Sequence, residues 1–138
     1  MKYLASLLLV GIGFLAIGQE AEQEETPMSG AKIYFAEKSY DFGDITQGEK
    51  VEYTFEFENV GNAPLILSDV RTTCGCTAPE WPKEPVAPGA SAKLRVVFNS
   101  AGKMGMQNKV ITVMSNAANS PERVKIVTNV MPASPDRN

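Results

Sequence analysis

Two cysteines separated by a single glycine are the residues with the clearest chemical capacity in this sequence. Cys74, Gly75 and Cys76 are consecutive, and the 138-residue chain contains no other cysteine. The chain also lacks histidine, which excludes a Ser-His-Asp triad, a Cys-His nucleophile and a His-ligated zinc site. The chemistry available here therefore depends on the state of the two thiols.

The first state open to the pair is a disulfide between neighbours. In an extended strand the Cα atoms of residues two apart are separated by about 6.6 Å, and their Cβ atoms diverge beyond the roughly 3.8 Å that a disulfide requires. Gly75 could relieve this by adopting backbone conformations that other residues avoid. So short a loop would stabilise the fold little and would be reduced more easily than a structural bridge. Cys74 and Cys76 are therefore candidates for a redox couple.

Metal binding and simple packing are the other two states of the pair. Cu(I) accepts thiolate and thioether ligands, so Met104 and Met106 could complete a site with both cysteines if the strands bring them together. Zinc is disfavoured because a structural site needs four strong ligands. Alternatively, both cysteines are small buried hydrophobic residues beside Trp81, and Gly75 marks a bulge or turn. The sequence leaves these alternatives open and predicts no cofactor.

Two further pairs of residues have both a chemical and a structural interpretation. Ser29 and Lys32 match the S-x-x-K motif of serine acylases, but that motif needs a helix and further elements that are missing here. Asp41 and Asp44 could act as acid and base. Their position on either side of Gly43 is more typical of a turn.

An acidic row and a single tryptophan complete the candidates. Glu52, Glu56 and Glu58 lie on one face of a predicted strand, where they would form a solvated face that blocks edge pairing. Calcium would need 6–8 converging oxygen ligands, which a flat face does not provide. Trp81 lies in a proline-rich segment, where it could anchor a partner or cover one end of the core.

The N-terminus has the pattern of an export signal. Lys2 precedes an apolar run over residues 4–17, which is too short for a spanning helix of about 20 residues but typical of a signal peptide. Small residues at positions 16 and 18 predict cleavage after Gly18. We therefore expect residues 1–18 to be a signal peptide and the mature protein to have no membrane span.

Charge separates the rest of the chain into segments. Residues 19–30 hold four glutamates and no apolar periodicity, so we expect a disordered acidic spacer. Residues 31–131 form the predicted domain, and residues 132–138 form a disordered tail. From residue 31 to residue 130 acids and bases are equal in number. A neutral domain without a basic cluster argues against nucleic acid as a partner.

Short strands with turn residues between them make up the predicted domain. The clearest runs from residue 51 to residue 58, where Val51, Tyr53, Phe55 and Phe57 alternate with polar residues. Residues 79–89 contain four prolines and are predicted to be a loop. The pattern predicts an all-β, immunoglobulin-like antiparallel β-sandwich of seven or eight strands. The predicted strands cover residues 33–35, 51–58, 65–70, 73–78, 92–98, 109–114 and 123–130.

Several motifs resemble one bacterial exported family, named domain of unknown function 1573. The likeness covers nearly all of residues 34–130, and its most specific part is the stretch C-G-C-T-x-P-x-W. The stretch N-x-G-x-x-P-L, from Asn59 to Leu65, is shared with domains resembling major sperm protein and with ciliary Hydin-type domains. The resemblance implies an immunoglobulin-like sandwich in the bacterial envelope, with scaffolding or interaction roles among related groups and no implied enzymatic activity. The family motif falls on Cys74, Gly75, Cys76, Thr77, Pro79 and Trp81.

We therefore predict an exported, non-enzymatic, immunoglobulin-like module that binds or organises other proteins of the envelope. It would be soluble in the periplasm or outside the cell, and exposed edge strands could pair two copies into a dimer. No catalytic residue is predicted, because no cationic group is evident beside the cysteines to activate a thiol. The alternatives are a thiol redox protein that uses Cys74 and Cys76, and a Cu(I)-binding protein.

Overall fold

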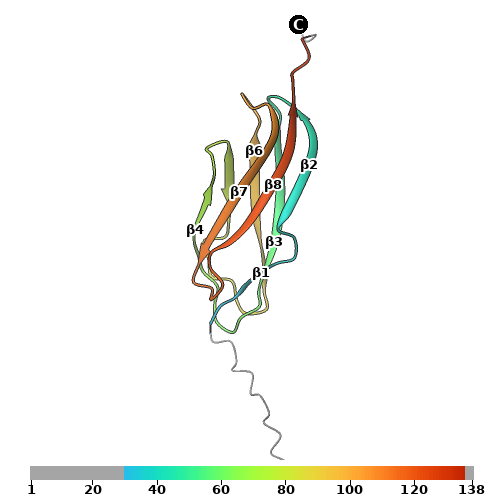
Figure 1. Ribbon diagram of the computed structural model, residues 1–138. Helices are drawn as coiled ribbons and strands as arrows, with labels where there is room; N and C mark the ends of the chain where they lie inside the picture. Colours follow the sequence, from blue (N-terminus) through green and yellow to red (C-terminus); the bar gives the residue numbers. More distant parts are fainter. Residues whose placement is uncertain (1–29, 136–138) are drawn as a thin grey trace, which may run out of the picture.

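The structure, a computed structural model, describes residues 30–135 as a sandwich of two four-stranded sheets (Figure 1). One sheet has the order β1-β3-β6-β5 and the other β2-β8-β7-β4. No helix occurs within the described residues, so the predicted all-β sandwich is confirmed. The strands are β1 (Ile33–Phe35), β2 (Ser39–Thr46), β3 (Lys50–Asn59), β4 (Leu67–Thr72), β5 (Thr77–Glu80), β6 (Ser91–Asn99), β7 (Gly105–Ser115) and β8 (Glu122–Met131).

Alternating side chains of both sheets build the core between them. On β3 the buried Phe55 and Phe57 alternate with exposed or half-buried polar residues, as the sequence pattern predicts. They face buried aliphatic residues of the opposite sheet, which places the interior between the layers. The largest fully buried apolar side chains are Phe55, Phe57, Phe98, Leu65, Leu94, Ile111, Ile126, Val96, Val113, Val124 and Val130.

Strand β2 was not predicted. Because it pairs with β8 in parallel, the sandwich is not purely antiparallel, contrary to the prediction from the sequence. The chain leaves one sheet after Phe35 and joins the other, where β2 pairs with β8 in parallel. Its residues are mostly exposed and lack a clean alternation. The register shifts between Asp41 and Asp44, Gly43 has a φ of 70°, and the Gly43 N–H donates to Asp41 Oδ1 over 2.8 Å. The two aspartates therefore flank a bulge inside a strand, which the Asp41 carboxylate stabilises, while the Asp44 carboxylate accepts from the Asn129 side chain.

The strand predicted over residues 73–78 is wrong over its first four residues. Residues 73–76 form a turn, and β5 begins only at Thr77 and continues through Pro79 to Glu80. The loop that was predicted to begin at residue 79 therefore begins only after Glu80. Pro79 is compatible with a strand because β5 lies at the edge of its sheet, where one side of the backbone needs no partner.

Several predictions fall outside the described residues. The signal peptide, residues 1–18, lies there entirely, as do Ser29 and nearly all of the predicted spacer 19–30. Residues 132–135, the described part of the predicted tail, contain no strand or helix. Between residues 30 and 135, no helix is long and apolar enough to cross a membrane.

Candidate functional site

The cysteine pair lies where the chain passes from one sheet to the other. Strand β4 is the edge of one sheet and β5 the edge of the other, and the turn 73–76 connects them. Cys74 and Cys76 are joined by a disulfide, with their Cα atoms 5.3 Å apart. The turn therefore shortens the separation that an extended strand would impose, and the bridge lies within the turn that joins the two sheets.

Hydrogen bonds from neighbouring residues hold the turn in place. The Thr72 hydroxyl donates to the Cys74 carbonyl over 2.9 Å, and the Asn99 N–H donates to the Cys76 carbonyl over 2.9 Å. Thr77 is buried, with 4% of its surface exposed. Its hydroxyl oxygen lies 3.9 Å from each of the two sulfur atoms. The bridge thus has one buried hydroxyl beside both of its sulfurs.

Gly75 does not play the conformational part that the sequence suggested. Its φ lies outside the left-handed region, unlike that of Gly43 or Gly89. A Cβ atom added at Gly75 would meet no atom within 4 Å. The ring therefore closes in this turn without using the conformations reserved for glycine.

Trp81 continues the same edge of the molecule after β5. Its ring is half-buried and packs against the core, which favours the end-covering interpretation over an exposed anchor. The Lys83 ammonium lies over the ring, 3.1 Å from its centroid, in a cation–π contact. The Trp81 Nε1 atom is buried without a hydrogen-bond partner in the described structure.

Met104 directly precedes β7, Met106 is its second residue, and both are exposed. No contact joins them to the cysteines among the interactions of the described residues, and the disulfide occupies both thiols. No three Cys, Asp or Glu side chains between residues 30 and 135 form a group that could hold a metal ion. A mixed cysteine–methionine copper site stays a prediction and would require prior reduction of the bridge.

The opposite side of the sandwich carries a second candidate site, which sequence reasoning missed. Strand β1 pairs with β3 only from Ile33 to Phe35, opposite residues 57–59. The rest of β3, residues 50–56, pairs with β6 on one side and with no described strand on the other. We refer to this free side of residues 50–56 as the open edge of β3. The edge is open because β1 is only three residues long, and no sequence motif indicates where β1 ends.

Backbone groups along the open edge can be assigned from the ladder. The Asn59 N–H donates to the Ala90 carbonyl of the β6 side, and the Ser100 N–H donates to the Glu49 carbonyl. Because the register between β3 and β6 is continuous, odd-numbered residues of β3 face β6 throughout. The N–H and C=O groups of Glu52 and Thr54 therefore point to the open side.

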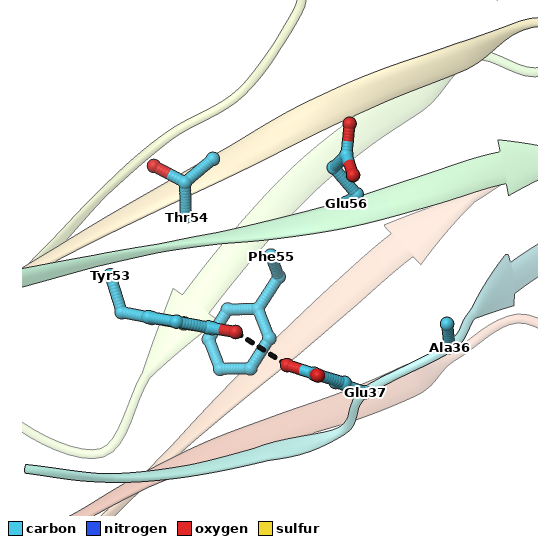
Figure 2. A pocket seen from close by; sticks show the side chains of 6 residues that line it. All are labelled: Ala36, Glu37, Tyr53, Thr54, Phe55 and Glu56. Carbon is cyan, nitrogen blue, oxygen red and sulfur yellow. Dashed lines mark hydrogen bonds between the residues drawn. The ribbon is translucent and has the colours of Figure 1, made fainter.

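A pocket of about 230 Å³ lies beside the open edge (Figure 2). Its base is formed by the rings of Tyr53 and Phe55, and the Tyr53 hydroxyl donates to the Glu37 carboxylate across it. The pKa of Tyr53 lies above its ordinary value. The hydrogen bond to Glu37 is the main cause, and partial desolvation adds to it. The lining residues are Ala36, Glu37, Tyr53, Thr54, Phe55 and Glu56.

A second pocket of about 160 Å³ adjoins the first, since both are lined by Ala36 and Glu56. It adds Glu58 and the exposed ring of Tyr34. No lysine or arginine lines either pocket, whereas three carboxylates do. The two pockets therefore form a shallow acidic groove with aromatic walls.

The three glutamates of the predicted acidic row on β3 have different surroundings. Glu52 pairs with Arg95, which also donates to Glu80 over 3.1 Å, and Glu52 raises the pKa of the guanidinium. Glu56 and Glu58 line the groove instead. Because β1 pairs with residues 57–59, Glu58 lies on a paired part of β3, whereas Glu52 and Glu56 lie along the open edge.

The sequence pattern of one family matches most of the described domain. The family is described as "Protein of unknown function (DUF1573)", and the match covers residues 33–130. It confirms the resemblance drawn from the motifs. No curated protein matches the chain.

Solved structures share the fold at low sequence identity. A protein of unknown function from Porphyromonas gingivalis W83 has a TM-score of 0.63 and 22% identity, over 72% of this chain and 46% of that one. The ASH / PapD-like domain 7 of human CEP192 has a TM-score of 0.60 and 15% identity, over 96% of this chain and 100% of that one. The secreted serine protease VesC from Vibrio cholerae has a TM-score of 0.57 and 17% identity, over 75% and 24%.

These likenesses establish the fold and no more. The chain spans less than half of the P. gingivalis protein and about a quarter of the protease. Together with the two four-stranded sheets, they confirm the immunoglobulin-like sandwich.

Proposed function

Since the chain belongs to the DUF1573 family, whose description assigns no function, we propose from its geometry that it is an interaction module of the bacterial cell envelope. Its binding site is the open edge of β3, which receives an extended segment of a partner protein. The segment becomes an additional strand beside β3 and continues the line of the short strand β1. No catalytic group takes part.

The observation that carries this proposal is the unpaired backbone of β3. The N–H and C=O groups of Glu52 and Thr54 face away from β6, and β1 ends before reaching them. In strand addition, such main-chain groups supply the affinity, and pockets for alternate side chains supply the specificity. The two pockets beside Ala36 and Glu56 are placed to take those side chains.

Charge indicates which extended segment would fit. Glu37, Glu56 and Glu58 line the groove without a basic residue among its walls, so lysine or arginine at alternate positions of the partner would be favoured. The chain's own residues 19–29 carry four glutamates and no lysine or arginine. Repulsion makes that segment a poor occupant and points to a separate basic partner.

Placement in the envelope is supported by two features. The apolar run over residues 4–17 after Lys2 has the length of an export signal. A disulfide between Cys74 and Cys76 is compatible with an oxidising compartment. The mass of the intact protein from envelope extracts tests this, because cleavage after Gly18 and an intact bridge each leave a defined mass.

The edge proposal is tested with a short peptide of alternating lysine and valine, followed by backbone NMR. We expect amide shifts concentrated at Glu52, Thr54 and Glu56, and no binding by a glutamate–valine peptide. Thr54→Pro removes the outward N–H without touching the β6 ladder and should abolish binding. Thr54→Val, which keeps the N–H, is the matched control. Equal binding by both variants, or shifts on another face, would overturn the proposal.

Thiol–disulfide exchange is a second candidate function, favoured by the position of Thr77. A partner thiolate would attack one sulfur of the bridge, the Cys74–Cys76 bond would break, and the other sulfur would leave as a thiolate. The Thr77 hydroxyl, 3.9 Å from both sulfurs, is placed to donate to that thiolate. A second partner thiol would then release the domain with both cysteines reduced and the partner oxidised. A reduction potential far below that of the compartment would rule this out.

A further inference from the structure

Three methionines lie exposed at one end of the sheet that contains β7 and β8. The exposed fractions are 52% for Met104, 69% for Met106 and 44% for Met131. Methionine is normally among the more buried residue types. Three exposed thioethers within two neighbouring chain segments therefore call for an explanation other than core packing.

The strand register places the three residues together. Gly105 pairs with Val130, and Met106 pairs with Asn129, in an antiparallel ladder. Met104 is the residue before β7, and Met131 is the last residue of β8, so both lie at the same end of this ladder. Because Val130 points into the core, its neighbours on β8 point outward. Met106, opposite Asn129, and Met131 thus lie on one outer face at diagonal positions of the two strands, and Met104 enters β7 beside them.

Asn129 gives the position of one sulfur. Its side-chain Nδ2 donates to the Met131 Sδ over 3.2 Å and to Asp44 Oδ1 over 3.0 Å. Asn129 is also the cross-strand partner of Met106. The Met131 sulfur is therefore turned back along β8 toward Asn129, the residue paired with Met106. The Asp44 carboxylate lies on the other side of Asn129, on strand β2.

We propose that Met104, Met106 and Met131 form a surface site for a soft monovalent cation, Cu(I). Thioether sulfur is a neutral, polarizable ligand that suits Cu(I) and suits Zn²⁺ or Ca²⁺ poorly. Cross-strand and same-face neighbours are close enough for flexible methionine side chains to converge on one ion. Asp44, through Asn129, adds a nearby negative charge of the kind that tunes metal sites. The disulfide takes no part, so the site is independent of the edge of β3 and of the redox state of the cysteines.

Ligand chemistry gives the site a signature that a cysteine site would lack. Thiolates must lose a proton before they bind metal, so their affinity depends on pH. Thioethers carry no proton, and binding by the methionine site should be constant across the mildly acidic to neutral range. The same comparison separates this site from the mixed site of Cys74, Cys76, Met104 and Met106 considered above.

The test is an anaerobic titration of the disulfide-intact protein with Cu(I), against a competing chromophoric chelator, with Ag(I) as a redox-inert probe. We expect one ion per chain and signal shifts at the three methionine methyl groups. Met106→Leu and Met131→Leu should each weaken binding by about tenfold or more. Met114→Leu, at the opposite end of β7, and the double variant Cys74→Ser/Cys76→Ser should bind as the parent does.

Two results would overturn the site. One is the absence of stoichiometric Cu(I) or Ag(I) binding by the oxidised protein. The other is binding that persists in the Met106→Leu and Met131→Leu variants and disappears in the double serine variant. Leucine is close to methionine in volume and all three positions are exposed, so loss of folding will not obscure the comparison.

Discussion

Tyr40 and Tyr53 stack face to face, with ring centroids 3.8 Å apart and ring planes inclined by 9°. Tyr40 belongs to β2 and Tyr53 to β3, so the stack joins the two sheets at the point where the chain has just passed from one to the other. Phe42 and Phe55 extend it with edge-to-face contacts on either side. The aromatic column closes the side of the sandwich below the open edge of β3.

Removal of the Tyr40 ring should loosen this side of the sandwich. Tyr40→Ala deletes the stack with Tyr53 and the edge contact with Phe42, and we expect a loss of about 1–2 kcal/mol in the free energy of unfolding. Tyr40→Phe keeps both ring contacts and should remain close to the parent. Urea denaturation of the three proteins measures the difference, and equal losses for both variants would contradict the stacking argument.

The hydrogen bond between Tyr53 and Glu37 predicts a loss of stability at alkaline pH. The carboxylate raises the pKa of Tyr53 in the folded state above its ordinary value near 10. The unfolded chain therefore loses the phenol proton first, and the contribution of this bond, complete below about pH 10, falls as pH rises toward the folded pKa. Tyr53→Phe should remove that part of the pH dependence.

Direct titration checks the same relationship from the side of the carboxylate. Glu37→Gln keeps an acceptor for the Tyr53 hydroxyl but removes the negative charge, so the pKa of Tyr53 should fall toward its ordinary value. Ultraviolet absorbance of the phenolate follows the titration, with Tyr53→Phe as the reference for the other tyrosines. An unchanged pKa in Glu37→Gln would show that the carboxylate is not the cause.

Local signals and long-range geometry account for what the sequence did and did not reveal. The alternation along residues 51–58 predicted β3 correctly because one face is buried and the other wet. β2 carries no such alternation, and only its pairing with β8 and the bulge at Gly43 make it a strand. The cysteine pair was recognisable as a local motif, whereas the open edge of β3 depends on where the chain changes sheets. Similarly, Met131 joins Met104 and Met106 only through the strand register.

The motif that begins at Asn59 has a structural explanation that the sequence did not provide. Asn59 is fully buried, and its amide donates to the carbonyls of Ala63 and Val86 over 2.8 and 2.9 Å. Its Oδ1 accepts from the N–H of Gly61 over 3.0 Å. The side chain thus bonds backbone groups of two loops and holds them together in the interior.

Substitution of Asn59 should consequently be among the most damaging changes in the domain. Asn59→Leu would deprive the Ala63 carbonyl and the Gly61 N–H of this partner and remove one of the two donors to the Val86 carbonyl, at a cost of about 2–4 kcal/mol. Asn62→Ala, which removes an exposed contact to Gly30, should cost well under half as much. Chemical denaturation of both variants tests this, and a near-neutral Asn59→Leu would refute the assigned role.

Alanine substitutions at Gly61 and Gly75 should have opposite effects on stability. A Cβ atom at Gly61 would lie 2.2 Å from the Gly30 carbonyl oxygen and 2.5 Å from the Lys32 nitrogen, both backbone atoms. Gly61→Ala must therefore displace the segment before β1 and should destabilise the domain by about 2 kcal/mol or more. Gly75→Ala meets no atom and no left-handed backbone, so its stability should stay within about 1 kcal/mol of the parent. Thermal unfolding of the two proteins distinguishes the positions.

Loss of the disulfide should lower the free energy of unfolding only slightly, while strand β5 at the edge of its sheet becomes more mobile. The loop between Cys74 and Cys76 spans only two positions, so the bridge restricts the unfolded chain weakly, and Cys74→Ser/Cys76→Ser should lose less than about 2 kcal/mol. The turn keeps the Thr72 hydroxyl bond and the Asn99 N–H bond to its carbonyls. Hydrogen exchange should therefore rise in β5 and leave the amides of β7 and β8 protected. Global unfolding of the double variant at neutral pH would instead make the bridge a structural requirement of the sandwich, and would exclude a cycle in which it is opened by a partner.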